Sequence, residues 1–129
     1  MSDLLKLHNE AMDLALLGDK ELELGNKENA CDYYFQAFEK EKEVAFLAEK
    51  MGNPEPGLSI LFRSSASLAL QCGKLREAER LIAHALAGNP TNEIAVELRN
   101  MLQIIYTSTE FDNLRGSSLR VGMTGANES

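Results

Sequence analysis

The fold of this chain is decided by one stretch, SILFRSSASLALQCGKLREAERLIAHALAGNPTN, residues 59–92. Its first half is apolar on most sides, with small Ser and Ala residues between the large ones. In its second half the apolar residues recur at helical spacing. Cys72-Gly73 separates the halves and Asn89-Pro90 closes the stretch, as expected where helices end. The stretch is therefore predicted to form two helices folded back on each other.

The flanking sequence predicts three further helices. Ser2 or Asp3 can cap the first helix and Thr91 the last, because short polar side chains accept hydrogen bonds from the first turn. Within the second helix, the run EKEKE at 39–43 is expected to be a solvated face. The five helices are expected over residues 3–24, 27–51, 58–71, 75–87 and 91–108. The fold class is thus predicted to be all-α, with five antiparallel helices and the third one central.

The residue pattern of 59–92 is similar to that of the tetratricopeptide repeat (TPR), a helical hairpin of about 34 residues. The matching positions are small where the helices cross, large beside them, glycine between the helices and proline near the end. They are Ala66, Ala78, Ala85, Phe62, Ile82, Gly73 and Pro90. Ser65 departs from the pattern, which has a large apolar residue there.

An earlier unit matches when it is counted from Ala11. Its matching residues are Leu14, Leu17, Gly18, Gly25, Ala30, Tyr34 and Ala37, with Lys42 in place of the proline. The resemblance implies a TPR-like α-α superhelix of about two repeats plus a capping helix. It would occupy residues 1–110, with a flexible tail, rich in Gly and Ser, over 111–129. An antiparallel bundle without repeats remains the alternative.

In TPR proteins the first helix of each hairpin lines a concave face that binds a segment of a partner. The resemblance therefore implies a non-catalytic protein–protein interaction module, such as a small adaptor or regulatory protein. The implied partner-binding residues are Met12, Ala15, Asp19, Leu22, Ile60, Arg63, Ser67, Leu70, Ile94, Glu97 and Met101. A basic or apolar helical segment is expected to suit the acidic first unit.

A structural homodimer is the alternative function. Fewer than three repeats are marginally stable alone, so the apolar surfaces of the first and fifth helices could be buried between two copies. Val44, Phe46 and Leu47, near the end of the long second helix, are then the expected interface.

Enzyme activity, cofactors and metals are not expected. The sequence has no Gly-rich phosphate loop, HExxH motif or nucleophile elbow. His8 and His84 are isolated in the sequence and are expected to face solvent. Neither has a Glu three residues before it, as a di-metal helical bundle would need.

Charge and composition narrow the expected partners further. The net charge is −7, and the acidic residues are concentrated in the first half of the chain. Because this charge repels phosphates, nucleic acids and anionic membranes are not expected as partners. Cys31 and Cys72 are expected to be buried and reduced. The absence of a signal-peptide pattern or an apolar run of ~20 residues predicts a cytoplasmic protein.

Overall fold

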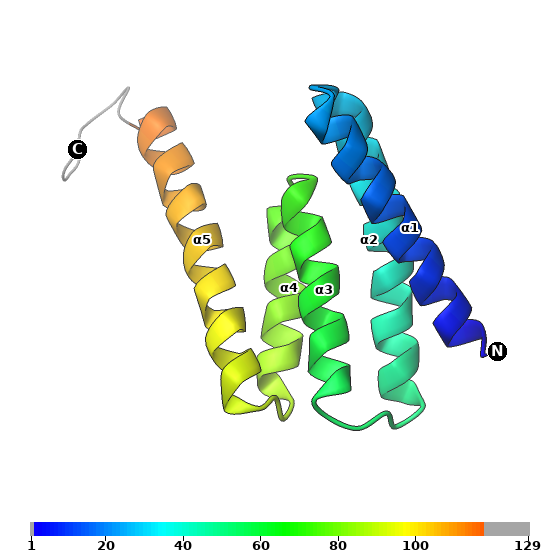
Figure 1. Cartoon of the computed structure of the whole chain (residues 1–129). Coiled ribbons are helices and arrows are strands. Elements are labelled where there is room, and N and C mark those ends of the chain that lie inside the picture. Colours follow the sequence, from blue (N-terminus) through cyan, green and yellow to red (C-terminus); the bar gives the residue numbers. More distant parts are fainter. Residues whose placement is uncertain (1, 118–129) are drawn as a thin grey trace.

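The computed structural model describes residues 2–117, and the side chains of residues 2–108. This part of the chain is all-helical. Successive helices run up and down the molecule, from α1 at one end of the array to α5 at the other (Figure 1). The helices are α1 (Asp3–Glu23), α2 (Lys27–Lys50), α3 (Gly57–Gln71), α4 (Leu75–Ala87) and α5 (Asn92–Ser117).

The helix boundaries follow the capping residues that the sequence predicted. The Ser2 hydroxyl accepts a hydrogen bond from the Leu5 backbone N–H at 3.2 Å, and the Thr91 hydroxyl accepts one from Ile94 at 3.4 Å. Gly25 and Gly73 end α1 and α3 with φ of 84° and 79°, a left-handed conformation that glycine adopts without strain. Four of the five helices therefore end within about a residue of their predicted ends.

The end of α5 differs from the prediction. The helix runs to Ser117, whereas the loss of apolar periodicity had predicted an end at about Ser108. Residues 109–114 contain neither glycine nor proline, so nothing in them stops the helix. The start of the expected tail at 111 falls within this helix, and its remaining residues, 118–129, lie outside the described part of the chain.

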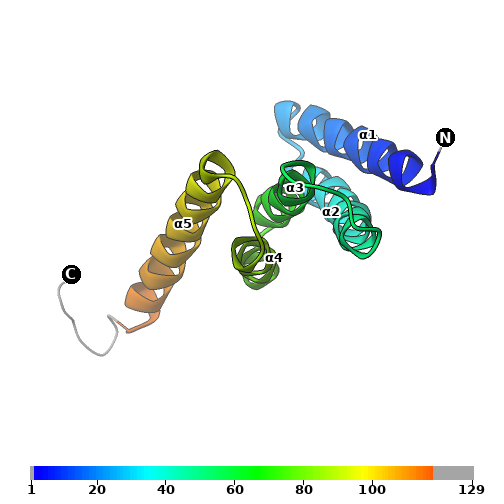
Figure 2. The ribbon, with the colours of Figure 1, turned by 90° about the horizontal axis from the view of Figure 1, so that it is seen from below.

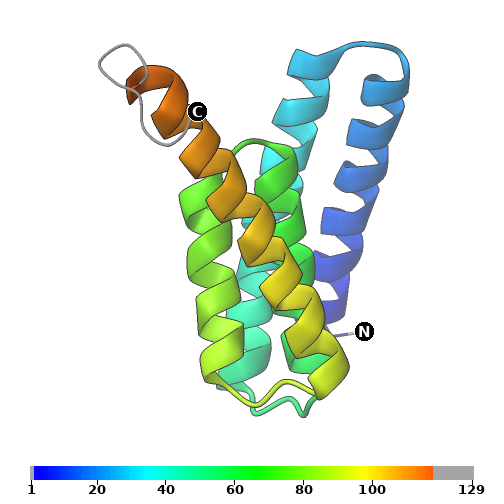
Figure 3. The same cartoon turned by 90° about the vertical axis from the view of Figure 1, so that its left-hand side faces the viewer.

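Each helix packs on its neighbours in the chain, and α3 also contacts α5. Seen along the helices, α1 and α5 lie at opposite ends with α3 between them (Figure 2). The side view shows α5 lying obliquely across α3 and α4 (Figure 3). As predicted, α3 is the central helix, and its position leaves one of its sides between the two outer helices.

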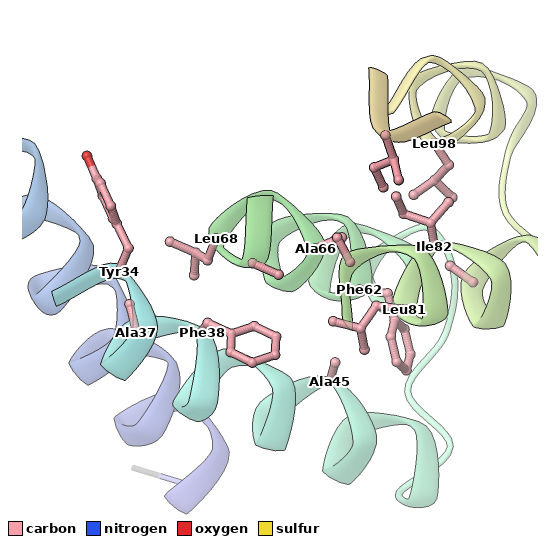
Figure 4. Packing of buried hydrophobic residues seen from close by; sticks show 14 of the residues in the cluster. Tyr34, Ala37, Phe38, Ala45, Phe62, Ala66, Leu68, Leu81, Ile82 and Leu98 are labelled. Carbon is pink, nitrogen blue, oxygen red and sulfur yellow. The ribbon is translucent and has the colours of Figure 1, made fainter. Parts of the chain in front are cut away.

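The core follows the small-and-large pattern of the sequence. Phe38, Phe62, Ile82 and Leu98 are its largest fully buried apolar side chains (Figure 4). Alanines lie between them, and where α1 crosses α2 the small residue is Gly18. A Cβ at Gly18 would lie only 2.7 Å from Cε1 of Tyr34. The small residues thus stand where helices approach closely.

Three predictions about α2 and the cysteines are wrong. Glu41 is fully buried rather than part of a solvated face, because it shares the inward side of α2 with Phe38 and Ala45. Val44 is also fully buried, so it cannot belong to a dimer interface. Cys31 and Cys72 are free thiols but only partly buried.

Candidate functional site

A groove of about 550 Å³ lies between α1, α3 and α5, and we call it the α1–α3–α5 groove. Its floor is the side of α3 that faces neither α2 nor α4, and α1 and α5 form its walls. The lining residues are Met12, Ala15, Arg63, Ser64, Ser67, Leu68, Leu70, Glu97, Met101 and Ile104.

Helical spacing explains how each element reaches the groove. On α5, Glu97, Met101 and Ile104 follow one another at four and three residues, which places them on one side of the helix. The adjacent side of α5, about a quarter-turn around the helix, buries Leu98 and Ile105. On α3 the exposed floor residue is Ser67, a side chain too small to fill the space above it. The groove therefore exists because large residues line its walls and a small one lies on its floor.

One ion pair crosses the groove from α3 to α5. The Arg63 guanidinium donates a hydrogen bond to the Glu97 carboxylate, and both side chains remain partly exposed. The two charges cancel, and most of the remaining lining is apolar. The groove therefore offers an adaptable apolar surface, since Met12 and Met101 have flexible thioether side chains, beside one exposed charge pair.

The structure brings together most of the residues expected to bind a partner. Seven of the expected side chains line the α1–α3–α5 groove: Met12, Ala15, Arg63, Ser67, Leu70, Glu97 and Met101. The other four do not. Ile94 is buried in the core and Ile60 packs against it. Leu22 is exposed near the end of α1, and Asp19 faces a different hollow.

Sequence reasoning missed three lining residues, Ser64, Leu68 and Ile104. Ile104 could have been found, because it lies one turn beyond Met101 on the same side of α5. Ser64 and Leu68 could not, since their access to the groove depends on how far α1 and α5 stand apart.

The acidic residues of α1 lie outside the groove. Asp13, Asp19 and Glu23 line a separate hollow of about 570 Å³ on α1 itself, together with Leu16, Leu17 and Lys20. Within it, Asp19 accepts a hydrogen bond of 2.6 Å from the hydroxyl of Tyr34. Burial and this bond to a carboxylate raise the pKa of Tyr34 to about 12. Asp13, Asp19 and Glu23 thus do not line the groove that a partner segment was expected to occupy.

Both histidines have carboxylate partners that the sequence did not reveal, although His84 is exposed as predicted and His8 is partly exposed. Nδ1 of His8 lies 2.9 Å from Oε1 of the buried Glu41. Nε2 of His84 lies 2.9 Å from both carboxylate oxygens of Glu49, and its ring packs against Phe46 and Phe62. The partners are 33 and 35 residues away along the chain, so no local motif reveals them. Each pair joins two helices.

Among the described side chains, residues 2–108, no group of three or more His, Cys, Asp or Glu is placed to hold a metal ion. Cys31 Sγ donates a weak hydrogen bond to the Cys72 carbonyl at 3.5 Å. Burial and the neighbouring Cys31 raise the pKa of the Cys72 thiol, which lowers its reactivity. None of the described helices has the length and apolar character needed to cross a membrane.

Comparisons with known proteins give no family or function for this chain. No family model, no curated protein and no solved structure matches the chain.

Proposed function

We propose that this chain is a non-catalytic protein–protein interaction module, a small adaptor or regulatory protein of the cytoplasm. It binds a segment of a partner in the α1–α3–α5 groove. The observation that supports this proposal is the groove itself, an open hollow of about 550 Å³ formed by three helices that are not consecutive in the chain. Grooves with flexible apolar walls suit the apolar face of a partner helix.

We further propose that the helices form a TPR-like array of about two repeats closed by α5. In support, the residues at the pattern's helix-crossing positions are all buried. They are Gly18, Ala30, Ala37, Ala66, Ala78 and Ala85. The alternating helices α1, α3 and α5 line the groove, as the first helices of successive repeats would. The long α2, which replaces the expected proline by Lys42, is the feature in which this array would depart from a regular one.

Filling the groove tests the proposal. Ser67 is exposed on the groove floor, so Ser67→Tyr should block a bound segment while leaving the core intact. Ala83 is exposed on α4, away from the groove, and Ala83→Tyr is the matched control. Proteins from the source cell that the wild-type chain retains should be lost from the Ser67→Tyr variant and kept by the control. Equal retention by all three chains would show that the groove is not the binding site.

A structural homodimer is the second candidate, favoured by exposed apolar side chains on α5. Val96 and Ile104 are both more than half exposed. The expected interface on α2 is reduced to Phe46 and Leu47, because Val44 is buried. Sedimentation equilibrium distinguishes the two candidates: a dimer that Val96→Asp dissociates, with no retained partner, would favour self-association over the groove.

A further inference from the structure

A second apolar surface lies on the side of α1 that faces away from α2. The buried residues of α1, Ala11 and Gly18, face α2. Leu16 is two residues before Gly18, which places it about 200° around the helix. We call this surface the outer face of α1 and define it by Asp13, Leu16, Leu17, Lys20 and Glu23. None of these residues lines the α1–α3–α5 groove.

The leucines of this face are exposed to an unusual degree. Leu16 is 61% exposed and Leu17 43%, and Leu24, next to the helix end, is 72% exposed. Isolated exposed leucines are common on protein surfaces, but adjacent ones lining a single hollow of about 570 Å³ indicate a contact surface. These leucines explain why another apolar surface would bind here. They do not indicate what charge the partner carries.

The charged residues at the edge of the outer face indicate which charge a partner should carry. Asp13 and Glu23 form no side-chain hydrogen bond or ion pair within residues 2–108, and the same holds for Lys20. Asp19 lines the same hollow, and its carboxylate accepts the hydrogen bond of the Tyr34 hydroxyl. Three acidic residues thus surround the leucines against a single base. Unpaired carboxylates around an apolar centre complement a surface whose centre is apolar and whose rim is basic.

We propose that the outer face of α1 binds a basic amphipathic helix of a partner protein. The apolar side of that helix covers Leu16 and Leu17, and its Lys or Arg residues pair with Asp13 and Glu23. A second copy of this chain is a poorer occupant, since a symmetric contact would place the acidic rim against itself. This surface does not depend on the groove, and both could be occupied at once.

A designed peptide pair tests the charge requirement. The probe is a synthetic helical peptide made of leucine and lysine with one apolar side, and its control carries glutamate at every lysine position. Isothermal titration calorimetry on the wild-type chain should detect binding of the lysine peptide and none of the glutamate peptide. Leu16→Asn, at an exposed position, should weaken binding of the lysine peptide by about tenfold, because the peptide would then bury a polar amide in place of a leucine side chain.

Charge-reversing substitutions test whether the lysine peptide binds at the outer face of α1. Asp13→Lys with Glu23→Lys should lower the affinity of the lysine peptide by about tenfold or more. The matched control is Glu39→Lys with Glu43→Lys, which makes the same charge change at exposed positions of α2. That control should change the affinity by less than about twofold. Circular dichroism establishes that each variant keeps its helix content.

Several results would overturn the proposal. Equal weakening by the two charge-reversed variants would mean general attraction to an acidic protein. Failure of the lysine peptide to bind, or binding of both peptides alike, would remove the charge requirement. A wild-type dimer that Leu16→Asn dissociates would make a second copy the occupant. Ser67→Tyr should leave peptide affinity unchanged, so a failed groove proposal would not be mistaken for a failure of this one.

Discussion

His8 on α1 holds the carboxylate of Glu41 on α2, with Nδ1 at 2.9 and 3.0 Å from its two oxygens. The Glu41 side chain is fully buried, whereas that of His8 is 31% exposed. A buried carboxylate is costly unless it is hydrogen-bonded. His8 therefore satisfies a buried carboxylate on the neighbouring helix while its own side chain still reaches water.

His8→Ala should lower the free energy of unfolding by about 2 kcal/mol, because it leaves the Glu41 carboxylate buried and unpaired. Urea denaturation measures the loss. The informative control is the same substitution in a Glu41→Met background, where no carboxylate remains. There the cost of His8→Ala should fall below about 1 kcal/mol. An equal cost in both backgrounds would mean that His8 acts through packing and not through Glu41.

Gly18→Ala should also destabilise the α1–α2 contact. An added Cβ would lie 2.7 Å from Cε1 and 2.9 Å from Cδ1 of Tyr34, and that ring is buried and fixed by its hydroxyl bond to Asp19. Overpacking costs about 1–3 kcal/mol, which exceeds the gain of up to about 1 kcal/mol from alanine's helix propensity.

Gly57→Ala is the matched control, since nothing lies within 4 Å of a Cβ at that position. It should be neutral or slightly stabilising. Thermal melting of the two variants separates the effects. A Gly18→Ala variant that melts at or above the wild-type temperature would show that α1 and α2 have space for a Cβ at this position. The small residue at 18 would then not be required by the close approach of the two helices.

Two buried serines of α3 should respond in opposite ways to alanine. The side-chain oxygen of Ser65 has no hydrogen-bond partner within the described residues, so Ser65→Ala removes an unsatisfied buried group. It should stabilise the chain by about 1 kcal/mol. The Ser59 hydroxyl donates to the Glu55 carboxylate at 2.7 Å. Ser59→Ala should therefore cost about 1.5 kcal/mol, since hydrogen bonds to charged groups are stronger than neutral ones.

Both substitutions remove one hydroxyl from the same helix, so their effects on the free energy of the unfolded chain should be nearly equal. The comparison between the two variants therefore reports on the folded state. The difference between their urea midpoints is the measurement to make. A destabilising Ser65→Ala would mean that the hydroxyl has a partner, such as a buried water. Ser65 is also where the sequence departs from the TPR pattern, and its Oγ is the one buried side-chain N or O atom without a hydrogen-bond partner among residues 2–108.

Local signals in the sequence were sufficient for the helices. Capping residues, glycines with left-handed φ and apolar periodicity act within a few residues, so the boundaries of α1 to α4 were predictable. The end of α5 was not, because loss of an apolar stripe signals exposure rather than the end of a helix. The helix continues through TEFDNL, residues 109–114, although the apolar periodicity has ended before it.

The groove was predictable only through helical register. Knowing which side of α3 is free places Arg63, Ser67 and Leu70 together, and the same reasoning on α5 places Glu97 and Met101. Asp19 was expected beside Met12 and Ala15 but lines the hollow on α1, where its carboxylate accepts a hydrogen bond from Tyr34 of α2. The His8–Glu41 pair was missed because its two residues lie on different helices. Side chains that depend on contacts between distant helices require the packing, which the sequence pattern does not specify.

The ion pair of Arg63 and Glu97 provides the last prediction, which concerns binding in the groove. Arg63→Glu should weaken retention of the wild-type chain's partners by about tenfold, because it places two carboxylates where the groove was neutral. Exposed ion pairs contribute at most about 1 kcal/mol to folding, so the variant should remain folded. The double variant Arg63→Glu with Glu97→Arg restores an ion pair with its direction reversed. It should melt like the wild type yet still bind weakly, since a partner meets each charge in the wrong place. If the reversed pair restores full binding, the ion pair acts only by holding α5 to α3. A bound partner would then not contact the charges of Arg63 and Glu97.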